Sequence, residues 1–126
     1  MNAPTATAPR TLLHLALLTD AVVTGLNGLA YLALAGPLQD LLGLPTGPMR
    51  AAGAFLLVFT AAVAFLGTRP RPPRGAVLAV VALNVAWVVG SLAVDAETVL
   101  GQVWVVAQAV VVAAFAAVQA YALRRR

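Results

Sequence analysis

Apolar residues run in four long stretches along the chain, and short segments rich in proline or charge separate them. The stretches cover approximately Thr11–Ala35, Pro48–Gly67, Gly75–Val94 and Thr98–Leu123. Each is about as long as the roughly 20 helical residues that cross a bilayer core about 30 Å thick. The pattern therefore predicts an all-α fold, a four-transmembrane-helix antiparallel bundle, with one membrane domain over residues 11–123. Residues 1–10 then form a short N-terminal tail, and residues 124–126 form a basic C-terminal end.

Composition supports a chain that is solvated by lipid. Hydrophobic residues make up 62% of the chain and charged residues only 10%, whereas about a quarter of the residues in soluble domains are charged. The chain has no cysteine, which excludes thiol chemistry. We expect no cofactor and no metal, because no nucleotide loop, zinc motif or pair of catalytic carboxylates is present. An enzyme is therefore disfavoured.

The eight basic residues are all arginine, and they are distributed unequally between the two sides of the predicted bundle. Seven fall on the side of both termini, namely Arg10, Arg69, Arg71, Arg74, Arg124, Arg125 and Arg126. The other side holds Arg50 together with Asp40, Asp95 and Glu97. By the positive-inside rule both termini are cytoplasmic. Arginines confined to the ends of apolar runs also argue against nucleic-acid binding, which needs a basic patch on a folded face.

One alternative for the first stretch is a cleaved signal peptide. Ala33-Leu34-Ala35 resembles a signal-peptidase site. However, the apolar region of a signal is typically about 7–15 residues, and this stretch is longer and contains Asp20. We therefore expect a retained span.

Three strongly polar residues are predicted to lie in one layer near the middle of the membrane. Asp20 follows Thr11 by nine residues, which is about 14 Å along a helix. Asn84 has the same estimated depth in the third span, and Gln108 reaches it from the opposite side. Because burial disfavours the charged form of a carboxyl group, we expect Asp20 to be protonated and to donate to Asn84 or Gln108.

Each of these residues belongs to a polar helix face, and such faces cannot point at lipid. The faces hold Asp20, Thr24, Asn27 and Tyr31; Asn84, Ser91 and Asp95, with Trp87 at the edge; and Gly101, Trp104, Gln108, Phe115 and Gln119. They should meet inside the bundle. The predicted ligand or proton site consists of Asp20, Asn27, Asn84, Trp87, Trp104 and Gln108.

Two interpretations of the polar layer stay open. Interhelical hydrogen bonds contribute about 0.6 kcal/mol on average in membranes and could hold the helices in register. Alternatively, an ionisable residue inside a membrane marks a functional site. The structural interpretation is favoured for Asn84 and Gln108. A functional role is favoured for Asp20, because an asparagine would stabilise the bundle comparably at lower cost.

Several segments together resemble a family of small four-helix bacterial integral membrane proteins of uncharacterised function. They are DAVVTGLNGLAYLALAGPLQDLLGLP, RAAGAFLLVFTAAVAFL, LNVAWVVGSL and QAVVVAAFAAVQAYALRR. In size and layout the chain is also similar to DoxX-like membrane proteins. The resemblance implies a four-span protein of the bacterial plasma (inner) membrane, and it implies nothing about chemistry.

The predicted function is non-enzymatic. We expect a small integral membrane protein that binds an apolar or lipid-like molecule in an outward-facing cavity, or an accessory or assembly subunit. The alternative is proton-coupled transport of a small lipophilic or cationic solute, with Asp20 as the proton carrier. The expected partners are the lipid bilayer, a hydrophobic small molecule or lipid, and a second copy or a larger membrane complex, with no nucleic acid.

Overall fold

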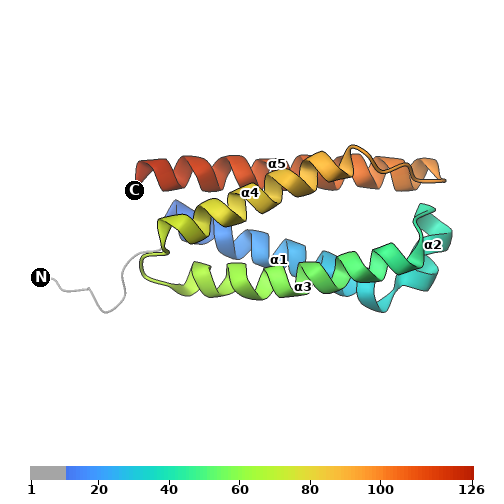
Figure 1. The fold of residues 1–126 in the computed structure, drawn as a ribbon, viewed down its shortest axis with the longest axis horizontal. Coiled ribbons are helices and arrows are strands. Elements are labelled where there is room, and N and C mark those ends of the chain that lie inside the picture. Colours follow the sequence, from blue (N-terminus) through green and yellow to red (C-terminus); the bar gives the residue numbers. More distant parts are fainter. Residues whose placement is uncertain (1–10) are drawn as a thin grey trace, which may run out of the picture.

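The computed structural model describes residues 11–126, and all its regular elements are helices. They are α1 (Leu12–Ala33), α2 (Ala35–Leu42), α3 (Thr46–Thr68), α4 (Arg74–Ser91) and α5 (Val99–Arg125) (Figure 1). By length and composition α1, α3, α4 and α5 are able to cross a membrane, which confirms the four predicted spans. The predicted tail, with Arg10, lies outside the described residues.

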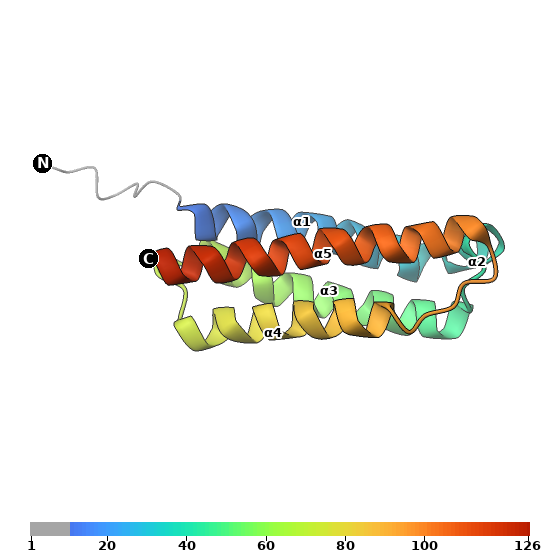
Figure 2. The ribbon, with the colours of Figure 1, turned by 90° about the horizontal axis from the view of Figure 1, so that it is seen from above.

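The four long helices form two antiparallel pairs. Helix α1 packs along α3, and α4 packs along α5 (Figures 1 and 2). Contacts between α1 and α5 join the pairs, whereas α3 and α4 scarcely touch. The bundle is therefore closed on three sides and open between α3 and α4.

The two ends of the bundle differ in charge. One end holds the start of α1, the connection 69–73 and the end of α5; we call it the arginine end, because six arginines lie there. The opposite end holds α2, residues 43–45 and the connection 92–98 (Figure 1). We call it the acidic end, after Asp40, Asp95 and Glu97.

Glycines permit the close approach of α1 and α3. A Cβ atom on Gly53 would lie 2.8 Å from the carbonyl oxygen of Gly28 and 2.8 Å from the nitrogen of Leu32. Any side chain at Gly53 would therefore push the two helices apart. Small residues are the usual means by which backbones approach in membranes.

Helix α1 begins with a capping box that also fixes the arginine end. The Thr11 side chain accepts from the backbone N–H of His14, and the His14 Nδ1 atom accepts from the backbone N–H of Thr11. The other ring nitrogen, Nε2, donates to the carbonyl oxygen of Arg69 at 2.6 Å. His14 is buried, so it joins the start of α1 to the connection 69–73.

Two predicted spans are shorter in the structure. The first ends at Ala33 rather than Ala35, because the backbone turns at Leu34 and α2 starts at once. Helix α2 then occupies most of the connection between the first two spans. The third span ends at Ser91 rather than Val94. Asp95 therefore lies outside the helix, and the prediction that it continues the polar face of Asn84 is wrong.

Helix α2 is tied to the start of α5 at the acidic end. Gly43 ends α2 with a φ of 67°, a left-handed conformation that favours glycine, and its carbonyl oxygen accepts from the N–H of Glu97 at 3.1 Å. Thr98 caps α5 by accepting from the N–H of Gly101, and its hydroxyl donates to the carbonyl oxygen of Leu41. The first turn of α5 therefore packs on α2.

The apolar core consists of two clusters, one in each half of the bundle. The cluster towards the arginine end contains Leu13, Leu17, Ala21, Phe59, Val63, Val77, Val80, Ala122 and Leu123. The cluster towards the acidic end contains Tyr31, Ala35, Met49 and Leu56, with Trp87 and Trp104 packed against it. Buried polar residues lie between the two clusters and form the candidate site.

Candidate functional site

Asp20 accepts hydrogen bonds from three side chains, one on each of the helices α1, α4 and α5. The hydroxyl of Thr24 donates to its Oδ1 atom at 2.7 Å. The amides of Asn84 and Gln119 donate to its Oδ2 atom at 2.9 Å and 2.7 Å. Asp20 and Gln119 are both 0% exposed. The carboxylate thus joins α1 to α4 and α5 in the interior of the bundle.

The two amides also bond to each other, which closes the cluster. The second hydrogen of the Asn84 amide is donated to Gln119 Oε1 at 3.1 Å. Thr24 lies one helical turn after Asp20 on α1, a spacing that brings side chains together. We call Asp20, Thr24, Asn84 and Gln119 the Asp20 cluster.

The direction of these hydrogen bonds differs from the prediction. Asp20 was expected to donate a proton to an amide, but the amides and the hydroxyl donate to Asp20. A carboxylate is an acceptor only, and its two oxygens offer about four acceptor positions. The surrounding helices supply the donors that fill three of them.

The prediction that Asp20, Asn84 and Gln108 converge is confirmed for the first two and wrong for Gln108. Its place is taken by Gln119, eleven residues later on α5. Eleven residues are about three full turns, so both glutamines lie on the same helix face but roughly 16 Å apart along the axis. The depth of Gln108 was estimated by counting residues from Thr98. The first turn of α5, however, packs on α2 at the acidic end, so ten residues along α5 do not reach the level of Asp20.

Gln108 belongs to a second polar group nearer the acidic end. It accepts from the Trp87 indole at 2.7 Å and donates to the Ser91 hydroxyl at 3.0 Å. One turn earlier on α5, Trp104 donates to the Tyr31 hydroxyl at 2.7 Å. Both tryptophan N–H groups are therefore paired, and these contacts join α4 to α5 and α5 to α1.

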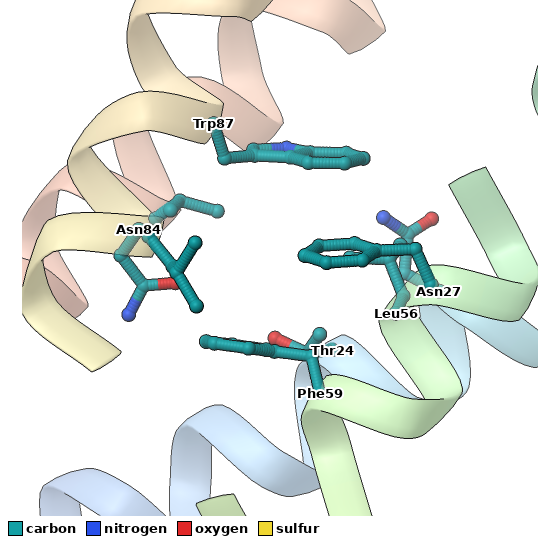
Figure 3. Close-up of a pocket in the computed structure, with 9 residues that line it drawn as sticks. Thr24, Asn27, Leu56, Phe59, Asn84 and Trp87 are labelled. Carbon is teal, nitrogen blue, oxygen red and sulfur yellow. The ribbon is translucent and has the colours of Figure 1, made fainter. Parts of the chain in front are cut away.

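A small cavity lies beside the Asp20 cluster. Its volume is about 20 Å³. The lining contains Thr24, Asn27, Phe55, Leu56, Phe59, Leu83, Asn84, Trp87 and Val112 (Figure 3). This is space for about one water-sized group.

A larger groove follows the open side of the bundle between α3 and α4. Its volume is about 400 Å³, and it is lined by Phe55, Leu83, Ala86, Trp87, Gly90, Ser91 and Val94. The Ser91 hydroxyl and the indole N–H of Trp87, which is paired with Gln108, are the only polar side-chain groups of this lining, so the surface is almost wholly apolar. The groove and the small cavity share Phe55, Leu83 and Trp87, and they therefore adjoin.

Aromatic rings bridge α3 and α4 where the two spaces meet. The ring centroids of Phe55 and Trp87 are 6.4 Å apart with planes 7° from parallel, and those of Phe55 and Phe59 are 6.0 Å apart at 18°. Phe55 is thus stacked against both Phe59 and Trp87, and Figure 3 shows the labelled rings of Trp87 and Phe59 on the side of the cavity opposite Asn84. A molecule in the small cavity would thus meet aromatic rings on one side and Asn84 on the other.

The predicted site residues divide between these features. Asn27, Asn84 and Trp87 line the small cavity, and Trp87 also lines the groove, whereas Asp20, Trp104 and Gln108 line neither. Sequence reasoning missed Phe55 and Phe59 as cavity walls. The available signal was the spacing of one helical turn between these two phenylalanines. Gln119 was placed on the correct face but not in the site.

No family model, no curated protein and no solved structure matches the chain.

Replacing Gln119 by methionine, which is similar in length, tests the Asp20 cluster. The change removes the bond to Asp20 and the bond from Asn84. We expect it to lower the free energy of unfolding by about 1–2 kcal/mol, since interhelical bonds contribute about 0.6 kcal/mol each and an unpaired buried donor adds to the loss. Gln108→Met should cost less, because Gln108 is itself partly exposed and its side-chain partners are neutral. Thermal or denaturant unfolding in detergent measures both, and an equal or larger loss for Gln108→Met would contradict the arrangement.

Proposed function

We propose that this protein is a non-enzymatic membrane protein that binds the chain of an apolar, lipid-like molecule in the groove between α3 and α4. The observation that carries the proposal is the groove itself. Its volume of about 400 Å³ is within the range of about 300–1,000 Å³ that is usual for small-molecule sites. Its lining is almost wholly apolar, as an aliphatic chain requires.

The position of the groove supports entry from the lipid rather than from water. Phe55, Leu83 and Val94 are each more than a third exposed along the open side of the bundle. In a bilayer this side would face acyl chains, so a ligand could move sideways between α3 and α4. The proposed cavity thus opens laterally, between the middle of the bundle and the acidic end.

Proton-coupled transport with Asp20 as the carrier is a second proposal. It is supported by the small cavity, because Asn84 lines this cavity and donates directly to Asp20. A solute in the groove would then be separated from the carboxylate by one amide. An accessory role, with the groove occupied by a helix of another protein, is a further outcome that the groove test below distinguishes.

For location, we propose a bacterial plasma membrane with both termini in the cytoplasm. Of the seven arginines in residues 11–126, six lie at the arginine end and only Arg50 lies near the acidic end. The positive-inside rule then orients the arginine end to the cytoplasm.

Single cysteines test this orientation, because the chain has none of its own. We expect Thr68→Cys, at the arginine end, to react with a membrane-impermeant maleimide only in inverted vesicles. Thr46→Cys, at the acidic end, should react only in intact spheroplasts. The opposite result, or labelling of both variants from both sides, would contradict the proposed orientation.

Gly90→Phe tests the groove. A Cβ atom on Gly90 would meet nothing within 4 Å, so the helix tolerates the ring, which fills the groove. The ring competes with a ligand for the same space, and a clash of about 1–3 kcal/mol, the usual cost of overpacking, corresponds to roughly a fivefold to 150-fold loss of affinity. Native mass spectrometry of protein extracted from membranes should show one retained lipid-like molecule, and Gly90→Phe should lose it.

Gly75→Phe is the matched control. Gly75 is on the same helix, is also exposed and has the same free space, but it lies near the arginine end and outside the groove lining. It should retain the molecule. Equal retention by both variants would contradict the proposal, and retention of a copurified protein instead of a lipid would favour the accessory role.

A further inference from the structure

We infer that the ligand is a single-chain amphiphile with a primary ammonium head, bound with its head inwards. The head occupies the small cavity against Asn84 and Thr24, in front of Asp20, and the chain lies in the groove. This inference rests on the proposed function, because it assigns the chain to the groove. Three properties of the small cavity carry it: the orientation of its polar atoms, its charge and its size.

The polar atoms of Asn84 and Thr24 that remain free are oxygens. Both hydrogens of the Asn84 amide are donated, one to Asp20 and one to Gln119, and the Thr24 hydroxyl hydrogen is donated to Asp20. Asn84 is only 4% exposed, and within residues 11–126 no group donates to its Oδ1 atom. Figure 3 shows this oxygen turned towards the aromatic rings and the amide nitrogen turned away. Asp20 therefore fixes the amide so that an acceptor faces the cavity.

An acceptor that is buried without a donor destabilises the protein, so a group that donates hydrogens is expected there. A primary ammonium has donors only, and it would need nothing in return from Asn84 or Thr24. A hydroxyl would leave its own lone pairs facing these two oxygens. Asn27, the remaining polar residue of the lining, carries an amide that can accept a further hydrogen.

The charge of the surroundings also favours a cation. The hydrogen-bond partners of the Asp20 carboxylate are all neutral side chains. Charges attract more strongly in a low-dielectric interior than in water, so the carboxylate favours a positive head one amide away. The rings of Phe55, Phe59 and Trp87 line the same space, and aromatic faces attract ammonium groups. A phosphate or carboxylate head would be repelled.

Size selects the type of ammonium. The cavity volume of about 20 Å³ admits one water-sized group. A primary ammonium is of that size, whereas a trimethylammonium group is several times larger. The attached chain would pass Phe55, Leu83 and Trp87, the residues that both spaces share, and continue along the groove towards Val94.

Three probes with the same chain test the inference on the full-length protein in detergent: dodecylamine, dodecanol and dodecyltrimethylammonium. Binding is followed by the fluorescence of Trp87 in a Trp104→Phe background, where Trp87 is the only tryptophan. We expect dodecylamine to bind at least about tenfold more tightly than either other probe, the effect of about 1.4 kcal/mol. In Asp20→Asn the affinities for dodecylamine and dodecanol should become equal within about threefold, an energy difference under 0.7 kcal/mol.

The outcomes separate this inference from the proposed function. Equal binding of dodecylamine and dodecanol to the wild type, or tight binding of dodecyltrimethylammonium, overturns the ammonium head and leaves the groove proposal standing. No binding of any probe, or binding that Gly90→Phe leaves unchanged, overturns both. The comparison of the three probes on the wild-type protein tests the ammonium head even if Asp20→Asn does not fold. If that variant folds, as its melting curve shows, and still prefers dodecylamine tenfold, then Asp20 is not the source of the preference.

Discussion

The structure depends on one carboxylate that is removed from solvent and surrounded by donors from its own bundle. Asp20 has no exposed surface, and a charge at the centre of a membrane helix costs about 2.5–3.5 kcal/mol on insertion scales. Hydrogen bonds from Thr24, Asn84 and Gln119 offset that cost. Because the donors come from α4 and α5 as well as α1, the same bonds set the register of α1 against the other pair. The apolar clusters on either side then pack in a fixed relation to each other.

This arrangement explains why the bundle is open on one side. The α1–α3 pair is held by close backbone contact at Gly28 and Gly53, and the contacts between α1 and α5 are reinforced by the Asp20 cluster. Nothing comparable joins α3 to α4, where the described contacts are few and aromatic rings span the gap. The groove is thus a consequence of where the polar and small residues lie. The Asn84 Oδ1 atom faces the small cavity because the amide nitrogen of Asn84 is turned towards Asp20, to which it donates.

The span number, the antiparallel order and the pairing of Asp20 with Asn84 could be predicted from the sequence, because hydropathy fixes spans and helical rise converts position to depth. That Gln119 rather than Gln108 pairs with Asp20 could not be predicted. It depends on where α5 begins relative to the other helices, and the tertiary contacts of Gly43 and Thr98 determine that position. The break at Leu34 was hidden because apolar residues continue through it. The role of His14 as a link to Arg69 was equally hidden, since a carbonyl oxygen carries no sequence signal. The groove exists because α3 and α4 do not pack closely against each other, and the hydropathy pattern of the sequence does not reveal which helices stay apart.

The central claim is that Asp20 is coupled to Gln119 on α5 and not to Gln108. A double-mutant cycle measures this directly, by combining Asp20→Ala first with Gln119→Met and then with Gln108→Met and following unfolding in detergent. Residues in one hydrogen-bond network show interaction energies of about 0.5–3 kcal/mol, whereas distant sites add within about 0.5 kcal/mol. The account predicts an interaction energy of about 1 kcal/mol or more for Asp20 with Gln119 and additivity for Asp20 with Gln108. Additivity for the first pair, or coupling of the second, would contradict it.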